Sequence, residues 1–133
     1  MLACVGDDAP VPSILVVDDD PMIRQTVRSI LELDGHAIME ADDGSCVLQV
    51  LDENRVDLVL TDILMPGWNG LRTISEVRRN NRDVKIIAMS GRGASCIHLD
   101  DASKLGADAG ITKPFNPNEL CALIADVLKR VRQ

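Results

Sequence analysis

The stretch VDLVLTDILMPGWNG, residues 56–70, decides the fold of this chain. Its short apolar run is followed by one acidic residue, Asp62, and then by a turn that contains proline and glycine. An apolar run of this length, bounded by turn residues, is typical of a strand buried on both faces of a parallel sheet. A carboxylate at the carboxyl end of such a strand points into the crevice where open α/β sheets bind ligands. Asp62 is therefore either a simple turn former or a functional residue.

Further strands are predicted on both sides of this stretch. Apolar runs place them at Ser13–Val17, Ala37–Ala41, residues 84–89 and Ala109–Thr112. The last of these is poor in strand-forming residues, so we expect it at an edge of the sheet. Residues 91–98 are expected to form a polar, glycine-containing loop.

Helices are predicted between the strands. Helical spacing of apolar residues indicates helices from Pro21 to the terminating Gly35, at residues 44–54, 70–80 and 99–105, and at residues 117–131. Asp20 and Asn116 each precede a proline, as is typical of a capping residue followed by the first helical position. In the third helix Arg78 and Arg79 are expected to face outward.

Five alternations of strand and helix predict an α/β fold. This pattern requires a parallel sheet with helices on both faces and right-handed crossovers, which is a doubly wound, three-layer sandwich. A length of 133 residues suits one domain with a single good core. We expect residues 1–12 to be a flexible leader and residues 13–133 to be the domain.

Composition and charge argue against several classes of function. A net charge of −7 argues against a nucleic-acid face, which needs clustered lysine and arginine. The four cysteines are scattered and form neither a CxxC pair nor a Cys/His cluster, so a zinc site is not expected. The chain has neither an apolar run of about 20 residues nor a signal peptide, so we expect a cytoplasmic protein without a membrane span.

Polar residues follow four of the five predicted strands. Asp18 and Asp19 follow the first, Asp62 ends the third, Ser90 follows the fourth and Lys113 follows the fifth. Three carboxylates in one crevice repel one another unless a cation lies among them. Mg²⁺ prefers such oxygen ligands, while a lysine and a hydroxyl can hold phosphoryl oxygens. Together these groups are the parts needed to place a phosphoryl group on a carboxylate.

Over about residues 13–131, the chain resembles the receiver domain of bacterial two-component response regulators. The motifs that carry the resemblance are ILVVDDDP, DLVLTDILMPGWNG, IIAMSG and ITKPF, in this order. The resemblance implies a flavodoxin-like (βα)5 fold with strand order 2-1-3-4-5. It also implies a single-domain, chemotaxis-regulator-like signalling protein.

The resemblance assigns a Mg²⁺ site to the acidic residues. Asp19 is expected to be the direct metal ligand, and Asp18 the second acidic ligand, through a water molecule. Asp62 and the backbone carbonyl of Leu64 should complete the protein's ligands.

The same resemblance assigns the phosphoryl site. Asp62 is expected to be the phosphoacceptor, and Ser90 and Lys113 to bind phosphoryl oxygens after activation. The bond between Lys113 and Pro114 is often cis in this family, an isomer that is uncommon in general.

The chain departs from the family at its usual switch. Many receivers carry a tyrosine or phenylalanine three residues before the active-site lysine, where this chain has Gly110. Ser90 stands where threonine is commoner. We therefore expect activation to be communicated by rearrangement of residues 91–105 instead.

These features predict a phosphorylation-controlled receiver. A sensor histidine kinase or a histidine phosphotransfer protein is the expected donor, and an unidentified protein is the downstream target. We expect no output domain after Gln133, unless the chain is a fragment of a larger regulator or hybrid kinase, and we expect no direct nucleic-acid contact.

Three alternatives remain open from the sequence. The first is a Mg²⁺-dependent phosphatase with Asp62 as nucleophile, although Leu64 stands where such enzymes carry a second aspartate. The second is an FMN-binding module, which three neighbouring aspartates disfavour by repelling the ligand's phosphate. The third is a degenerate receiver that acts only by binding.

Overall fold

The computed structural model describes residues 11–64, 69–80, 83–91 and 95–130, and for residues 95–98 it describes the backbone only. Most of the predicted leader, the turn at residues 65–68 and residues 92–94 of the predicted polar loop therefore lie outside the described residues. The described strands form one parallel sheet in the order β3-β2-β4-β5-β6. Their bounds are β2 (Ser13–Val17), β3 (Ala37–Ala41), β4 (Leu58–Asp62), β5 (Lys85–Ser90) and β6 (Ala109–Thr112).

This strand order confirms the predicted topology. Numbered along the chain from β2, the sheet order is 2-1-3-4-5, which is the flavodoxin-like arrangement. The short strand β6 lies at an edge of the sheet, as its poor strand propensity predicted.

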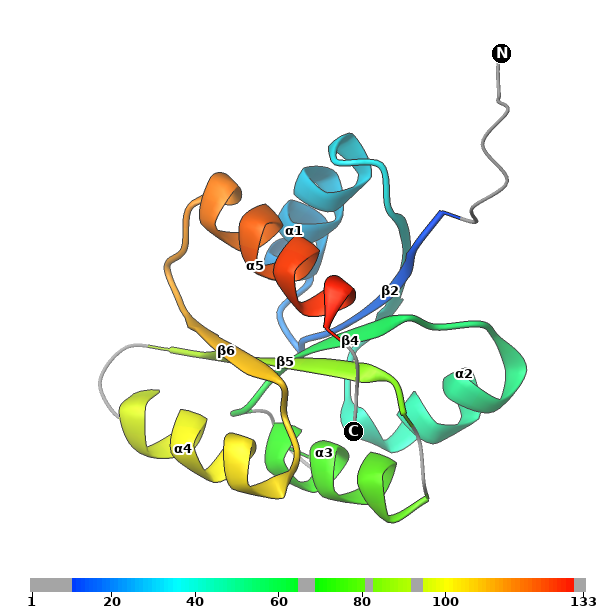
Figure 1. Cartoon of the computed structure of the whole chain (residues 1–133), viewed down its shortest axis with the longest axis vertical. Coiled ribbons are helices and arrows are strands. Elements are labelled where there is room, and N and C mark those ends of the chain that lie inside the picture. The colour runs from blue at the N-terminus through cyan, green and yellow to red at the C-terminus, as the bar shows by residue number, and fades with distance from the viewer. Residues whose placement is uncertain (1–10, 65–68, 81–82, 92–94, 131–133) are drawn as a thin grey trace.

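Helices cover both faces of the sheet (Figure 1). One face carries α1 (Pro21–Leu33) and α5 (Pro117–Lys129). The other carries α2 (Val47–Glu53), preceded by the short 3-10 helix η1 (Gly44–Cys46), together with α3 (Gly70–Arg79) and α4 (Ser95–Leu105). None of the helices in the described part of the chain has the length and apolar composition needed to cross a membrane.

The central strands are buried on both faces, which explains their continuous apolar sequences. In β2, Ile14 and Val16 belong to the core under α1 and α5, while Leu15 and Val17 belong to the core on the opposite face. All four side chains are fully buried. Burying such side chains stabilises the fold by roughly 1.5–3 kcal/mol each.

Local capping rules predicted two helix starts correctly. The Asp20 side chain accepts a hydrogen bond from the backbone N–H of Met22 at 2.9 Å, immediately before Pro21. The Asn116 side chain accepts one from the backbone N–H of Glu119 at 2.7 Å. Each cap satisfies a donor that the first helical turn leaves free.

Several element boundaries differ from the predictions, most of them by one to three residues. Helix α4 begins at Ser95, four residues earlier than predicted, so the polar loop is shorter than its composition indicated. Because α4 packs against α3, β5 and β6, tertiary contacts outweigh its weak local propensity. Strand β5 spans Lys85–Ser90, one residue later than predicted at both ends.

The prediction that Arg78 faces outward is wrong. Its side chain is only 15% exposed and pairs with Asp108 at 3.1 Å. It also donates to the backbone carbonyls of Gly106 at 3.0 Å and Val84 at 2.7 Å. Asp108 in turn accepts from the backbone N–H of Ile86 at 2.8 Å. Arg78 therefore fastens the end of α3 to the segments that lead into β5 and β6.

We expect Arg78→Ala to lower the free energy of unfolding by about 2–3 kcal/mol, because it leaves a largely buried carboxylate and two carbonyls without this donor. Urea denaturation measures the loss. Arg79→Ala is the matched control, because its side chain is 72% exposed and pairs with Glu76 on the same helix. That variant should stay within about 0.5 kcal/mol of wild type. Equal losses in the two variants would contradict the role given to Arg78.

Candidate functional site

Polar side chains lie at the carboxyl ends of four strands of the sheet. Asp18 follows β2 directly, Asp62 ends β4, Ser90 ends β5 and Lys113 follows β6. The parallel register holds these ends together, with Asp62 beside Met89 and Ser90 beside Thr112. The structure thus brings together the side chains of Asp18, Asp62 and Lys113, and it places Ser90 at the end of the strand next to Asp62.

Three carboxylates form the acidic part of the site. One oxygen each from Asp18, Asp19 and Asp62 lies within 4.8 Å of the other two. Asp18 and Asp62 are buried, at 1% and 7% exposed, whereas Asp19 is exposed. This mixture of buried and accessible oxygen ligands fits a hard divalent cation that keeps part of its water shell.

Lys113 joins the two buried carboxylates. Its Nζ lies 2.9 Å from Asp18 Oδ2 and 3.4 Å from Asp62 Oδ1. Its backbone N–H donates to the carbonyl of Ser90 at 2.7 Å, which ties the lysine to the end of β5. The Lys113–Pro114 peptide bond is cis, as expected.

The charges at this site shift the pKa values of its members. Burial, together with the neighbouring charge of Asp18, raises the pKa of the Asp62 carboxyl, and Lys113 only partly offsets this rise. Burial lowers the pKa of the Lys113 amine, but the hydrogen bond to Asp18 and the charges of Asp62 and Asp18 outweigh burial and raise it. The lysine is thus held as a cation, while a single lysine does not fully neutralise the carboxylates.

Ser90 ends β5, and Leu64 comes shortly after the end of β4. Ser90 is buried, and its hydroxyl donates to the carbonyl of Gly91 at 3.4 Å. A donor in so long a contact can turn to another acceptor at small cost. Leu64 follows β4 by two residues, and its side chain is 56% exposed.

Gly70 contacts the backbone of Asp62, which the sequence reasoning did not predict. A Cβ atom at this position would lie 2.2 Å from the backbone oxygen of Asp62. The Gly70 N–H donates to the carbonyl of Ile63 at 2.8 Å. Glycine therefore lets the start of α3 approach the end of β4 closely. A glycine at a first helical position, where a better helix former could stand, was the one indication available.

Gly110 also has a packing consequence. A Cβ atom there would lie 2.7 Å from Cδ2 of Leu99 on α4. The leucine therefore occupies the space beside β6 into which any side chain at position 110 would begin to extend.

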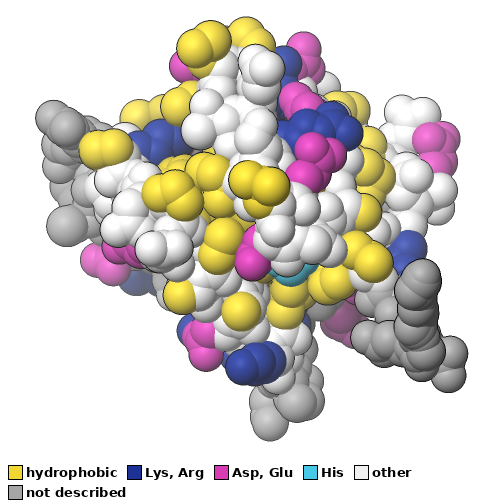
Figure 2. All heavy atoms as spheres, turned by 90° about the horizontal axis from the view of Figure 1, so that it is seen from above, with side chains coloured by type: hydrophobic (Ala, Val, Ile, Leu, Met, Phe, Trp, Pro, Cys, Tyr) yellow, Lys and Arg dark blue, Asp and Glu magenta, His cyan; other side chains and the backbone are white. Residues whose placement is uncertain are grey.

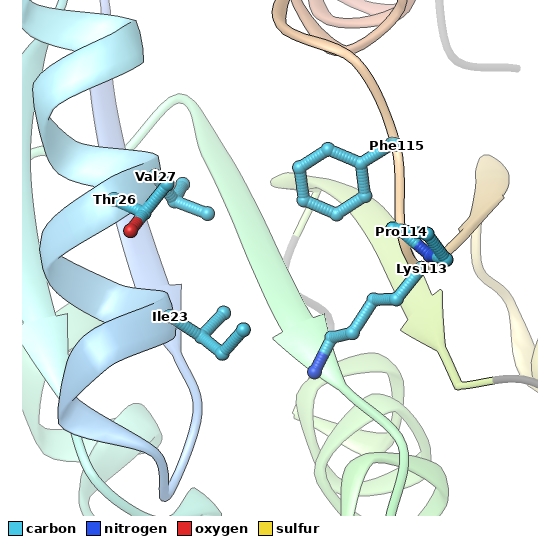
Figure 3. A pocket seen from close by; sticks show the side chains of 6 residues that line it. All are labelled: Ile23, Thr26, Val27, Lys113, Pro114 and Phe115. Atoms are coloured by element: carbon cyan, nitrogen blue, oxygen red, sulfur yellow. The ribbon is translucent and has the colours of Figure 1, made fainter.

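An apolar cavity of about 360 Å³ adjoins the lysine. Figure 3 shows the side chains from α1 facing those of the segment after β6 across it. Its lining residues are Ile23, Thr26, Val27, Lys113, Pro114 and Phe115. On the α1 and α5 side of the molecule, hydrophobic side chains are interspersed with acidic and basic ones (Figure 2).

Comparison with known proteins places this geometry in a family. A family model described as the response regulator receiver domain matches residues 14–125. The aerobic respiration control protein ArcA of Escherichia coli K12 is 39% identical over 119 residues, which are 90% of this chain and 49% of ArcA. The phosphate regulon transcriptional regulatory protein PhoB of the same strain is 37% identical over 120 residues, 89% of this chain and 52% of PhoB. The chain spans about half the length of these curated relatives.

Solved structures agree with this assignment. A receiver domain protein from Clostridium thermocellum superposes with a TM-score of 0.83 at 29% identity, covering 90% of this chain and 96% of that one. The chemotaxis protein CheY4 of Vibrio cholerae superposes with a TM-score of 0.82 at 28% identity, covering 89% and 99%. The resemblance seen in the sequence is confirmed, and the chain belongs to the response regulator receiver domain family.

Proposed function

We propose that this chain is the phosphoacceptor of a two-component phosphorelay and that Asp62 receives the phosphoryl group. The observation that carries the proposal is the position of Lys113, whose Nζ lies between Asp18 and Asp62. A cation so placed can move from pairing a carboxylate to holding a phosphoryl oxygen on that same carboxylate. The family consists of signalling modules, which supports a signalling role over catalytic turnover.

The acidic group would hold Mg²⁺. Asp19, Asp18, Asp62 and the backbone carbonyl of Leu64 are the proposed ligands. The three clustered carboxylates support this choice, and so does the raised pKa of Asp62, because it comes from burial and from the charge of Asp18, and a bound cation would offset both. When bound, the ion supplies charge neutralisation for the incoming phosphoryl oxygens.

Transfer starts from a phosphohistidine of a sensor histidine kinase or of a histidine phosphotransfer protein. A carboxylate oxygen of Asp62 forms the new bond to phosphorus while the bond between phosphorus and the imidazole nitrogen breaks. The electron pair of the broken bond stays on the imidazole. Lys113 would then hold one phosphoryl oxygen, and the Ser90 hydroxyl would turn from Gly91 to donate to another.

The product would act through altered protein contacts. A phosphoryl group adds negative charge at a nearly buried carboxylate, and such a change biases elements that have two arrangements. A net charge of −7 supports a protein target over nucleic acid as the direct partner. A cytoplasmic location is part of this proposal, as is a domain that spans residues 13–133.

Incubation with acetyl phosphate and Mg²⁺ should add one phosphoryl group to the wild-type chain, detectable by intact-mass measurement. Asp62→Asn should show no added mass, because an amide oxygen is a poor nucleophile for phosphorus. Removal of Mg²⁺ by EDTA should also abolish labelling of the wild type.

Asp20→Asn is the matched control for this experiment. Asp20 lies in the same acidic run but is exposed and caps α1, and asparagine caps helices equally well. It should be labelled like wild type. Equal labelling of the wild-type and Asp62→Asn chains would reject Asp62 as the acceptor, and a wild type that takes no label would favour a receiver that acts only by binding.

Without metal at pH 7, Asp62→Asn should unfold at a higher urea concentration than wild type. The raised pKa of Asp62 means that the folded chain binds this proton more tightly than the unfolded chain. Wild type therefore loses stability as pH rises from the ordinary value of 3.8 through the raised value, and the asparagine variant does not. The gap should shrink as pH falls toward 3.8.

Mg²⁺ should also shrink this gap at pH 7, because an ion bound only to the folded wild type stabilises it. Asp20→Asn should follow wild type within about 0.5 kcal/mol throughout. A wild type as stable as Asp62→Asn in EDTA at pH 7 would contradict the electrostatic account.

Beryllofluoride with Mg²⁺ should shift the backbone amide resonances of residues 99–105. Leu99 packs against Gly110, three residues before Lys113, so movement of the lysine toward a phosphoryl-like group should disturb α4. Amides of residues 47–53 in α2, which packs against α3 and η1, serve as the internal reference. Shifts confined to residues 18–20, 62 and 113 would show that α4 does not transmit activation.

A further inference from the structure

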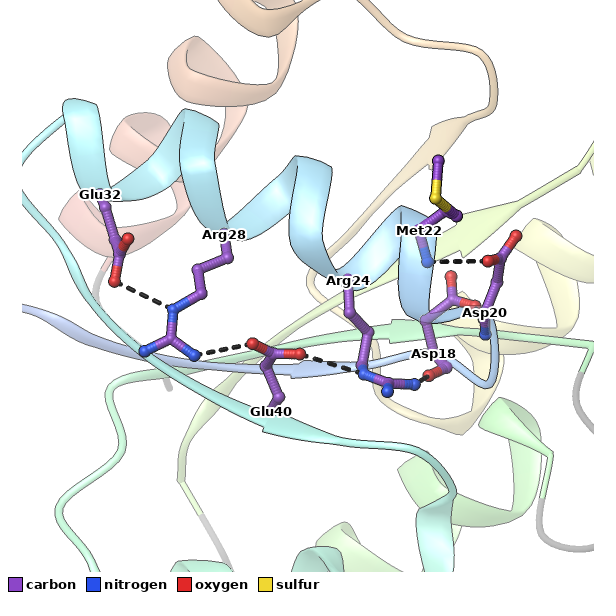
Figure 4. Close-up of polar contacts among 7 residues, drawn as sticks. All are labelled: Asp18, Asp20, Met22, Arg24, Arg28, Glu32 and Glu40. Carbon is purple, nitrogen blue, oxygen red and sulfur yellow. Dashed lines mark hydrogen bonds and ion pairs between the residues drawn. The ribbon is translucent and has the colours of Figure 1, made fainter.

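A chain of ion pairs links α1 to β3 beside the site (Figure 4). Arg28 on α1 contacts Glu32 at 3.0 Å and Glu40 on β3 at 2.7 Å. Glu40 also contacts Arg24 at 3.1 Å. This series of contacts reaches Asp18, because Arg24 Nη1 donates to the Asp18 backbone carbonyl at 2.6 Å.

The bonded carbonyl belongs to the peptide group between Asp18 and Asp19. These two residues carry two of the three clustered carboxylates. Rotation of this peptide group would swing both side chains relative to Asp62. The contact is therefore with the backbone unit that sets where two candidate metal ligands lie.

Strand β3 holds the same segment in two ways. The carbonyl of Ala41 accepts from the Asp18 N–H at 3.1 Å, directly through the backbone. The neighbouring Glu40 acts through Arg24, which grips the Asp18 carbonyl. Both peptide groups of Asp18 are thus bonded to groups that β3 supplies or fixes.

Arg24 is suited to this task because its guanidinium is rigid. Nε faces Glu40 while Nη1 faces the Asp18 carbonyl, so one planar group spans both acceptors. Only 18% of the Arg24 side chain is exposed, against 42% for Arg28. Hydrogen bonds from Arg28 and Arg24 lower the pKa of Glu40, which keeps this anchor charged.

We propose that Arg24 is a positioning residue for the divalent cation, fixing the Asp18–Asp19 peptide group from its anchor on Glu40. The inference rests on the proposed function, since it concerns the same Mg²⁺ site. Groups that orient metal ligands without touching the ion commonly change affinity about tenfold or more when they are removed.

Charge alone predicts the opposite result, which makes the test decisive. Removing a nearby positive charge should strengthen cation binding. Loss of the peptide anchor should weaken it. The direction of the change therefore separates positioning from simple electrostatics.

The experiment measures Mn²⁺ binding from the free-ion EPR signal, with Mg²⁺ as competitor, at a temperature where circular dichroism shows each variant folded. We expect Arg24→Gln, and Arg24→Lys with its charge retained, to bind Mn²⁺ about tenfold more weakly than wild type. Acetyl phosphate labelling should need a correspondingly higher Mg²⁺ concentration for half-maximal rate. At saturating Mg²⁺ the maximal rate should recover to within about twofold, because Arg24 does not touch the reacting atoms.

Arg28→Gln is the matched control, since it loses one charge and two ion pairs but no contact with Asp18. It should bind Mn²⁺ at least as tightly as wild type. Glu40→Gln should weaken binding in the wild-type background and add nothing to Arg24→Gln, because its effect passes through Arg24.

Two outcomes would overturn the inference. Arg24 variants that bind Mn²⁺ as well as wild type, or an Arg28→Gln variant weakened as much as they are, would reduce the ion pairs to a structural link between α1 and β3. A wild type that binds no Mn²⁺ or Mg²⁺ at millimolar concentration would remove the proposed function together with the inference.

Discussion

Like charges held close together at one edge of the sheet are the constraint on which the rest of this domain depends. Asp18 and Asp62 are almost fully buried, and within the described residues Lys113 is the lysine that pairs with both. A third carboxylate, Asp19, adds to the excess of negative charge. The fold tolerates this arrangement because its stability comes from apolar cores on both faces of the sheet. An incompletely neutralised site is poised to respond when a cation or a phosphoryl group arrives.

The backbone around the acidic group is correspondingly well fastened. The Asp18 N–H is bonded to β3, its side chain accepts from the N–H of Asp20 at 2.9 Å, and Asp62 ends a strand paired on both sides. At Gly70, helix α3 approaches the Asp62 backbone so closely that no side chain fits. The backbone therefore has little room to move the repelling carboxylates apart.

Features governed by local rules were predictable from the sequence. The strand Ser13–Val17 and the caps at Asp20 and Asn116 follow from apolar runs and from proline at the first helical position. Convergence of Asp18, Asp62 and Lys113 also followed, because the ends of parallel strands share one edge.

Features that depend on distant partners were not predictable. Arg78 lies 30 positions from Asp108, and Arg24 lies 16 from Glu40, so sequence spacing gives no sign of either pair. The early start of α4 depends on packing against α3 and the sheet, which local composition does not reveal. Helical periodicity predicts the face of the helix on which an arginine lies, but it does not predict which backbone carbonyls the side chain reaches.

The pair formed by Arg78 and Asp108 lies where β5 and β6 begin, whereas the carboxylates lie where strands end. This stabilising ion pair and the acidic group thus lie at opposite ends of the strands. Substitutions near Arg78 and Asp108 can change thermal stability without altering the carboxylates. Because the two are separate, the residues around the carboxylates can vary in sequence while contacts at the amino ends of β5 and β6 keep the fold intact.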